Sequence, residues 1–507
     1  MKRIPSNMTK CVVCGAALAA TLTAEGASSA QAAEVEVYQS SRAGDQLARV
    51  EVPQAGIDAS REIRLYPDRG YQTIVGIGGA FTESAADALS ALSEEKRREV
   101  IEAYFSPRQG GYSLTRTHVG SCDFSLGSYT YAEVEGDEAL EHFTIDPDRK
   151  LLLPLIKDSM AVPGADFKIL ASPWTAPPWM KDNGAYFGGS LLPEYREVYV
   201  NYLSKYLDAY AAEGVPIWGL TPVNEPEGNN ANWESMHFSP EQMRDFIANH
   251  LGPVFRSENR DTKIFVFDQN RDHMEEWAKV VYADDAVRSF VDGMAVHWYS
   301  STVDVCAEAL DAVHHAYPDM QIMHTEGCID ALGDDEPMWS WLEADWYWRE
   351  EATDWGVFWA PEEQKVDHPP YSPVYRYAGD IIGGLNHWMT GWIDWNMVLD
   401  TRGGPNHVKN FCGAPVLIDR EKGEAFYTPL YYVMCHFSRF IRPDAVRIGI
   451  EGAEGDIEGT AVRNVDGSIV AVLLNRGLEE QAYRLVCGDR EVTLLMPPQS
   501  LQTVALR

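Results

Sequence analysis

Two glutamates of this sequence each stand at the end of a short apolar run, directly before a Pro or a Gly. Glu225 ends "GLTPVNE" and Glu326 ends "MQIMHTE". Two carboxyl groups that face each other can cleave a glycosidic bond, because one protonates the leaving oxygen while the other attacks the anomeric carbon or activates water. A separation of about 5 Å predicts retention of configuration through a covalent intermediate, and about 6.5 Å or more predicts inversion.

Either glutamate taken alone is equally typical of a surface carboxylate or a structural ion pair. A site is favoured because other polar and aromatic side chains follow similar apolar runs. These residues are Arg116, Asp123, Trp174, Trp179, Asn224, His297, Trp298, Tyr299, Asp394, Trp395 and Asn396. Together they predict a pocket lined by acids, amides and indoles.

The elements that must position these side chains are short runs rich in apolar and β-branched residues. They cover residues 73–81, 112–120, 167–174, 217–225, 263–270, 292–300, 320–327 and 391–399. Helical patterns alternate with them, as in residues 195–214, where Tyr and Leu recur at three- and four-residue spacing. Strands that alternate with helices predict a parallel sheet, and eight of them predict a (β/α)₈ barrel of the TIM type with its catalytic groups at the carboxyl ends of the strands.

Outside residues 73–435, which we assign to the barrel, the pattern changes to alternating strands with turn residues. Three such strands precede the barrel within residues 34–72, and six follow it within residues 436–507. We expect both chain ends to pair into one accessory β-sandwich.

The first 33 residues have the features of an export signal: basic residues, a mildly apolar stretch and small residues ending in "SSAQAA". We expect a mature protein that is periplasmic or extracellular. Cys11 and Cys14 would be removed with the signal. The six remaining cysteines are widely spaced, which favours free thiols and leaves one disulfide open.

The net charge of −34 makes a nucleic-acid partner improbable, because no basic stripe is present to replace phosphate counterions. No later segment is long and apolar enough to predict a transmembrane helix. The acidic "GDDEP" at residues 333–337 lacks the ligand spacing of a calcium site and reads as a solvated turn. Two carboxylates and water are sufficient to cleave a glycosidic bond, so we expect no metal and no organic cofactor.

Several motifs together resemble glycoside hydrolase family 30, and within it the glucosylceramidase branch. They include "GIGGAFTESAA", "SCDFSLGSYTYA", "ILASPWTAPPWMK", "TPVNEPE", "AVHWY", "TEGC" and "GWIDWNMVLDTRGGPNHVKNF". The resemblance runs in order from about residue 64 to 507. It implies a retaining β-glycosidase that acts on β-glucosyl linkages of a glycolipid or an oligosaccharide.

The resemblance also implies roles for single residues: Glu225 as general acid/base and Glu326 as nucleophile. Asn224 would bind the sugar 2-hydroxyl, while Arg116 would orient the carboxylates from behind. The positions implied to hold the glucosyl unit are Asp123, Trp174, Trp395 and, at the pocket rim, Asn410. From the residues themselves, Tyr299 is expected to donate a hydrogen bond to Glu326 and is also counted among the substrate-binding residues. His297, at a strand end, is expected to lie with Arg116 behind the residues that contact the substrate.

Other functions stay open at this point. Relatives in the same family would share the catalytic pair and differ in their loops, so an endo-β-1,6-glucanase or a β-xylosidase is an alternative. The Trp-rich residues 338–370 are a candidate for shaping the aglycone side or for packing against the barrel. A non-catalytic carbohydrate-binding module is the alternative outside the enzymes. Contact with a lipid surface and the oligomeric state stay undetermined.

Overall fold

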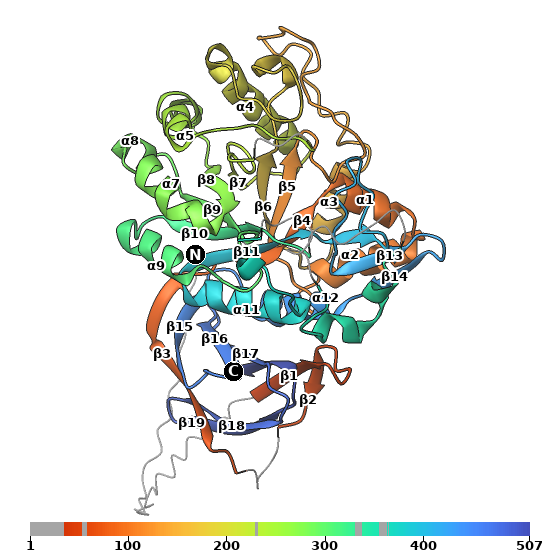
Figure 1. Cartoon of the computed structure of the whole chain (residues 1–507), viewed down its shortest axis with the longest axis vertical. Helices are drawn as coiled ribbons and strands as arrows, with labels where there is room; N and C mark the ends of the chain where they lie inside the picture. Colours follow the sequence, from red (N-terminus) through yellow and green to blue (C-terminus); the bar gives the residue numbers. More distant parts are fainter. Residues whose placement is uncertain (1–34, 53–57, 229–231, 330–336, 354–361, 364) are drawn as a thin grey trace, which may run out of the picture. The chain divides into compact units, whose positions relative to one another are not determined.

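The computed structural model describes residues 35–52, 58–228, 232–329, 337–353, 362–363 and 365–507. The expected export signal, most of "GDDEP" and two tryptophans of the Trp-rich segment, Trp355 and Trp359, lie outside these residues. The described chain confirms a TIM barrel joined to a β-sandwich that contains strands from both chain ends (Figure 1).

The barrel is a closed ring of parallel strands in the order β10-β11-β4-β5-β6-β7-β8-β9. Each predicted run contributes one strand. The strands are β4 (Gly76–Phe81), β5 (Leu114–Val119), β6 (Lys168–Pro173), β7 (Gly219–Leu220), β8 (Lys263–Asn270), β9 (Gly293–His297), β10 (Gln321–Glu326) and β11 (Met389–Asn396).

Large apolar side chains from different strands pack together as one cluster, among them Leu114, Leu170, Phe265, Met323 and Ile393. They fill the barrel core, as branched and aromatic side chains do in other barrels of this type. Polar side chains can therefore lie beyond this apolar layer, at the carboxyl ends of the strands.

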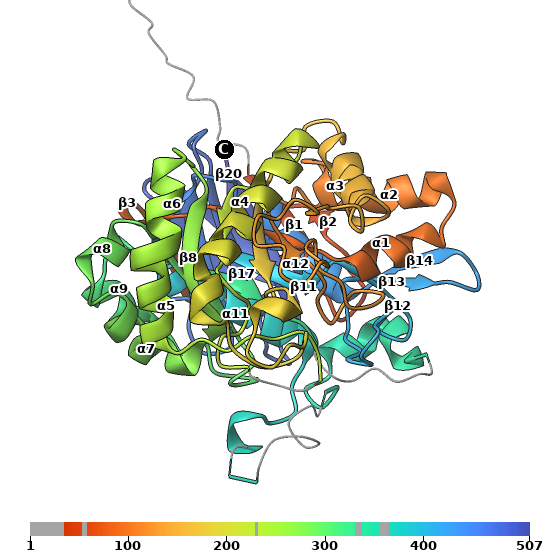
Figure 2. The same cartoon turned by 90° about the horizontal axis from the view of Figure 1, so that it is seen from above.

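Helices cover the outside of the barrel, with α5 to α9 along one side and α1 to α3 along another (Figure 2). Predicted helix 195–214 is observed as α4, which buries four tyrosines of its apolar face. The helices are α1 (Glu83–Ser90), α2 (Glu94–Phe105), α3 (Leu152–Met160), α4 (Arg196–Ala212), α5 (Pro240–Phe246), α6 (Gly252–Ser257), α7 (Met274–Val281), α8 (Asp285–Arg288), α9 (Ala307–Ala316), α11 (Pro373–Asn386) and α12 (Pro429–Ser438).

The sandwich is one hydrogen-bonded sheet of nine strands in the order β19-β18-β3-β15-β16-β17-β20-β1-β2. Its two ends pack face to face around Leu485, Leu494 and Val504, so a single folded sheet makes both layers. The strands are β1 (Val35–Ser41), β2 (Ala48–Val50), β3 (Arg61–Thr73), β15 (Val446–Glu451), β16 (Ile457–Arg463), β17 (Ile469–Asn475), β18 (Gln481–Cys487), β19 (Arg490–Met496) and β20 (Ser500–Leu506).

Helices α11 and α12 lie between the barrel and this sheet (Figure 1). On α12 the buried ring of His436 bonds to Ser40 Oγ at 2.9 Å and to Thr503 Oγ1 at 2.8 Å, which ties both chain ends to the barrel. These polar contacts between packed elements favour one fixed arrangement of sandwich and barrel.

Two smaller features complete the described chain. Strands β12 (Val398–Asp400), β13 (Val416–Asp419) and β14 (Glu424–Tyr427) form a separate small sheet after the last barrel strand. In the Trp-rich segment, Trp341, Trp346 and Trp348 are buried in short 3₁₀ turns, whereas Trp339 is exposed. Among the described residues, no helix has the length and apolarity needed to span a membrane.

Candidate active site

A cavity of about 470 Å³ opens at the carboxyl ends of the barrel strands. Eight of the ten predicted site residues line it directly: Asp123, Trp174, Asn224, Glu225, Tyr299, Glu326, Trp395 and Asn410. The other two, Arg116 and His297, are fully buried behind it. The structure therefore brings all ten predicted residues into one place.

The two glutamates face each other closely. One carboxylate oxygen of Glu225 and one of Glu326 lie within 4.8 Å of each other. This separation fits a direct nucleophilic attack and is too short to hold a water between carboxyl groups as an inverting enzyme does.

Local backbone geometry helps to place Glu225. Its φ is +48°, a left-handed conformation that is uncommon for a residue with a side chain. The backbone N–H of Glu225 donates to the carbonyl of Asp268 at 3.0 Å, which holds this turn in place. Such strained positions are often found at functional sites.

Arg116, on β5, orients one of the two glutamates, Glu326, whereas the bond to Glu225 comes from His297. The Arg116 guanidinium donates to Glu326 Oε2, to Asn224 Oδ1 at 2.6 Å and to Asp268 Oδ2 at 2.8 Å. Because a guanidinium offers its donors in a fixed plane, these bonds set the orientation of all three acceptors.

Asp268, at the end of β8, is the buried anion at the centre of this network. Besides Arg116, its carboxylate accepts hydrogen bonds from four residues on other strands or strand ends: Ser172, Thr221, Thr325 and His297. Burial alone would raise the pKa of Asp268, but the Arg116 charge and the bonds from His297 and Thr325 outweigh it and hold the pKa well below its ordinary value.

His297 lies between Asp268 and Glu225. Its Nε2 is 3.0 Å from Asp268 Oδ1 and its Nδ1 is 3.2 Å from Glu225 Oε1. Burial lowers the pKa of His297, but the charge of Glu326 and the bonds to Asp268 and Glu225 raise it to about 9. The imidazolium is therefore the stable form at neutral pH.

The environment of Glu326 combines opposing influences. Burial raises the pKa of Glu326, the positive charges of His297 and Arg116 lower it, and the charge of Glu225 raises it again. The net pKa lies above the ordinary glutamate value. Tyr299 Oη donates to Glu326 Oε1 at 3.2 Å, so donors contact both oxygens of this carboxylate.

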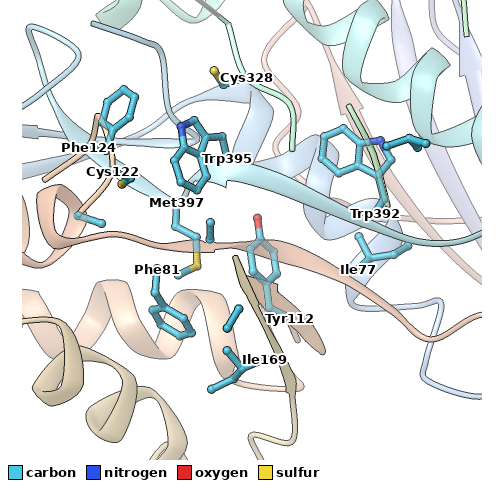
Figure 3. Close-up of a cluster of buried hydrophobic side chains, with 14 of the residues drawn as sticks. Ile77, Phe81, Tyr112, Cys122, Phe124, Ile169, Cys328, Trp392, Trp395 and Met397 are labelled. Atoms are coloured by element: carbon cyan, nitrogen blue, oxygen red, sulfur yellow. The ribbon is translucent and has the colours of Figure 1, made fainter. Parts of the chain in front are cut away.

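Indole rings form the apolar wall of the cavity. Trp174 and Trp395 stack with centroids 5.1 Å apart, and Trp395 meets Phe124 edge to face at 6.0 Å. Figure 3 shows Trp395 above Met397 and beside Phe124, so the ring rests on the hydrophobic core. A fixed aromatic surface of this kind suits the apolar face of a sugar ring.

Asp123 presents one free carboxylate oxygen. Asn410 Nδ2 donates to its Oδ2 at 2.9 Å, whereas Oδ1 is buried and has no hydrogen-bond partner among the described residues. Burial raises the pKa of Asp123 well above its ordinary value, with a further contribution from the charge of Glu326. An unpaired buried carboxyl oxygen in a cavity is suited to a ligand hydroxyl, which can both donate and accept.

Glu225, His297 and Glu326 are the described residues whose donor atoms come close enough together to surround a cation. The hydrogen bonds and protonation of these three side chains do not suit a metal ligand. Arg116 already bonds to Glu326, and a protonated His297 has no lone pair to offer a metal. The donor set instead fits proton transfer.

Several other residues at strand ends have structural contacts instead. Trp179 donates to the Ala132 carbonyl at 2.8 Å, Asp394 accepts from Tyr377 at 2.8 Å, and Asn396 accepts from Thr82 at 2.7 Å. Trp298 packs under the Arg376 guanidinium, 4.0 Å from the ring centroid. These side chains support the barrel rim.

Sequence reasoning missed Asp268, although it belongs to the Asp-Gln-Asn triplet that ends the fifth predicted strand. Gln269 and Asn270 of the same triplet line the cavity, as do Asn232, Trp233, Cys328 and Cys412. The strand-end position of the triplet was a usable signal. Asn232, Trp233, Cys328 and Cys412 reach the cavity because of the way their loops fold, and their spacing in the sequence does not predict this.

Comparison with known proteins confirms the family resemblance. The model of the glycosyl hydrolase family 30 TIM-barrel domain matches residues 74–342 and 348–441, and that of the family's beta sandwich domain matches residues 444–504. The chain is 33% identical to a lysosomal acid glucosylceramidase of Mus musculus, over 87% of this chain and 83% of that protein.

Two further proteins are similar across most of the chain. An endo-1,6-beta-D-glucanase of Neurospora crassa is 28% identical over 81% of this chain and 80% of its own. The crystal structure of SrfJ from Salmonella typhimurium superposes with a TM-score of 0.80 at 28% identity, covering 93% of this chain and 99% of the other. One family model matches the barrel, the other matches the sandwich, and the barrel holds a close pair of carboxylates. The chain therefore belongs to glycosyl hydrolase family 30, a family of retaining glycoside hydrolases.

Proposed function

We propose that the protein hydrolyses β-glucosyl linkages, with glucosylceramide cleaved to glucose and ceramide as its reaction. The observation that carries the proposal is the pair of carboxylates within 4.8 Å inside a cavity walled by tryptophans. The similarity to a glucosylceramidase over most of both chains supports the choice of substrate.

In the first step, the Glu326 carboxylate attacks the anomeric carbon while Glu225 gives its proton to the leaving oxygen. The C1–O bond to the aglycone breaks and a glucosyl ester forms on Glu326. In the second step Glu225 takes a proton from water, the resulting oxygen attacks C1, and the ester bond to Glu326 breaks. Two inversions give net retention, and no other reactant is consumed.

The surrounding residues have matching roles in this proposal. Asn224, held by Arg116, and Asp123, held by Asn410, offer polar groups to the sugar hydroxyls. Trp174 and Trp395 offer the stacking surface. Arg116 and the His297 imidazolium stabilise the negative charge that the two glutamates carry between them.

The acidic limb of the pH–rate profile tests the role of Glu326. A nucleophile must be ionised, and the pKa of Glu326 is raised above the ordinary value of 4.5, so kcat/KM is expected to fall with decreasing pH around a midpoint above that value. Tyr299→Phe removes one donor to this carboxylate and should move the midpoint up by about half a pH unit. A midpoint below the ordinary value, unmoved in Tyr299→Phe, would contradict the assignment.

The substrate is tested by digesting glucosylceramide and β-1,6-glucan side by side. We expect glucose from glucosylceramide and no short gluco-oligosaccharides from the glucan, because the contacts proposed here are all to one terminal glucosyl unit. Release of short gluco-oligosaccharides from β-1,6-glucan, with glucosylceramide left intact, would show the substrate to be wrong.

An endo-acting β-1,6-glucanase is the second candidate function, and the similarity to the Neurospora crassa enzyme supports it. A β-xylosidase would need the same carboxylates and a site that excludes the glucose hydroxymethyl group. The binding-module alternative is not supported, because the chain belongs to a family of retaining glycoside hydrolases and keeps two carboxylates within 4.8 Å of each other. We also propose that the enzyme is exported, on the composition of residues 1–33 alone.

A further inference from the structure

A buried Glu paired with a partly exposed His beside the cavity joins three loops and takes no part in the chemistry described above. Glu234 follows β7 and is fully buried, and His407 follows β12. Glu234 Oε1 lies 3.3 Å from His407 Nε2 and accepts a bond from Ser121 Oγ at 2.8 Å. On the opposite side of the ring, His407 Nδ1 lies 2.9 Å from the Ser125 carbonyl oxygen.

These partners determine the charge of the ring. A carbonyl oxygen and a carboxylate oxygen only accept hydrogen bonds, so both ring nitrogens of His407 must carry a proton to satisfy Ser125 and Glu234. The Ser128 hydroxyl, 3.5 Å from Nε2, is a longer contact to the same nitrogen and can donate to it only when Glu234 has lost its bond. The geometry therefore describes an imidazolium paired with a carboxylate. Loss of one proton leaves two acceptors facing a single N–H, and one contact must be given up.

The pair is connected to the sugar-binding groups on both sides. Three residues after His407, Asn410 donates to Asp123, the acid whose free oxygen faces the cavity. Trp233 directly precedes Glu234 and lines the same cavity. Asn406, directly before His407, bonds to the backbone carbonyl and N–H of Asn410 at 3.0 and 3.1 Å. A displaced His407 would therefore be felt at Asn410 through Asn406, and a displaced Glu234 at Trp233.

We propose that Glu234 and His407 are positioning residues that make glucoside binding depend on pH, because only the protonated pair holds Asn410 against Asp123 and Trp233 against the cavity. The inference rests on the proposed function for the identity of the ligand. We call the contacts that His407 makes with Glu234 and Ser125 the clamp. The clamp is a property of the loops and can be tested without a ligand.

The charged groups around the pair set the direction of the effect. Burial lowers the pKa of His407, but its bond to Glu234 and the charges of Glu234 and Asp123 outweigh burial and raise it above the ordinary value. Glu83, on α1, also faces His407 and is itself near Lys150; His118 and Lys181 lie near Glu234. The clamp is therefore complete at acidic pH and is lost as pH rises past the raised pKa of His407.

Binding of an uncharged aryl β-thioglucoside, which is not hydrolysed, is the first measurement. In the wild type, Kd should rise about fivefold from about pH 5.5 to about pH 9. Glu234→Gln should weaken binding at the lower pH and shift the rise to lower pH, while His407→Gln, which keeps a donor but cannot titrate, should remove the rise. Identical curves for all three proteins would overturn the proposal.

Hydrogen–deuterium exchange of residues 402–412 in the unliganded enzyme is the second measurement. At about pH 6, Glu234→Gln should increase exchange there by about tenfold, and the difference from wild type should vanish at about pH 9. Equal exchange at both values overturns the clamp. If the loops respond as expected while the wild type binds no thioglucoside at any pH, the proposed β-glucoside function fails and the clamp stands.

His387→Gln is the matched control for both measurements. His387 pairs with Asp311 at 3.1 Å, away from the cavity, and both side chains are more than a third exposed. We expect its Kd and its exchange in residues 402–412 to follow the wild type at each pH. An effect equal to that of Glu234→Gln would show a general response to losing a His–acid pair and would overturn the specific role.

Discussion

Replacing Glu326 with alanine is expected to lower kcat on an aryl β-glucoside by at least about 10⁴-fold, ~5 kcal/mol of barrier. Among the described residues, Glu326 is the carboxylate that faces Glu225 and is oriented by Arg116, so its loss removes the group that forms the covalent intermediate. Glu225→Ala should be milder on substrates with good leaving groups, about 10²-fold, because such groups depart without protonation. Initial rates on aryl β-glucosides with good and poor leaving groups measure both effects.

Azide distinguishes the two roles by stereochemistry. In Glu326→Ala, azide fits the space of the lost carboxylate and attacks a β-glucosyl fluoride from that side, which gives the α-glucosyl azide. In Glu225→Ala, the glucosyl ester on Glu326 still forms, and azide attacks from the other side to give the β-glucosyl azide. Opposite products are required because the carboxylates flank opposite faces of the anomeric carbon.

Glu308→Ala is the control, since Glu308 is an exposed residue of α9 on the outside of the barrel. We expect wild-type rates and no azide product from it. Near wild-type turnover in a folded Glu326→Ala protein, or the same azide anomer from both variants, would contradict the assignment of roles.

Positions at strand ends could be predicted because the strand pattern is visible in the chain. Glu225, Glu326 and Arg116 each belong to an apolar run, so the barrel topology alone places them at one mouth. The separation of the carboxylates could not be predicted, because it depends on the left-handed turn at Glu225 and on the Arg116 bonds.

The buried position of Asp268 could not be predicted from its own segment of the sequence. Phe267 and Asp268 both have positive φ, which turns the end of β8 so that the Asp268 carboxylate is buried among five partners from other segments. Each partner is an ordinary Ser, Thr, His or Arg in the sequence. The pair of Glu234 and His407 was missed for a related reason, since two loops far apart in the chain bring it together.

Asp268→Asn is expected to lower the free energy of unfolding by ~3–5 kcal/mol. The substitution keeps the volume but leaves Arg116 and His297 without their shared buried anion. Activity should fall as well, because Arg116 then loses one of the bonds that orient it toward Glu326. Urea unfolding followed by tryptophan fluorescence measures stability, and kcat on an aryl β-glucoside measures activity. Thr325→Val, which removes one neutral donor to Asp268, is the control and should cost about 1 kcal/mol.

The pH dependence of stability gives the sharper form of this prediction. His297 has a folded-state pKa of about 9 against an ordinary value of 6.5, so its contribution to stability is complete below the ordinary value and is lost as pH rises through the folded one. In the wild type this loss is on the order of 3 kcal/mol. Asp268→Asn removes one of the groups that raise the pKa of His297, so its stability should fall less over the same pH range. An equal fall in both proteins would show that Asp268 does not hold the proton on His297, and the network would then be held by Glu326 and Glu225 instead.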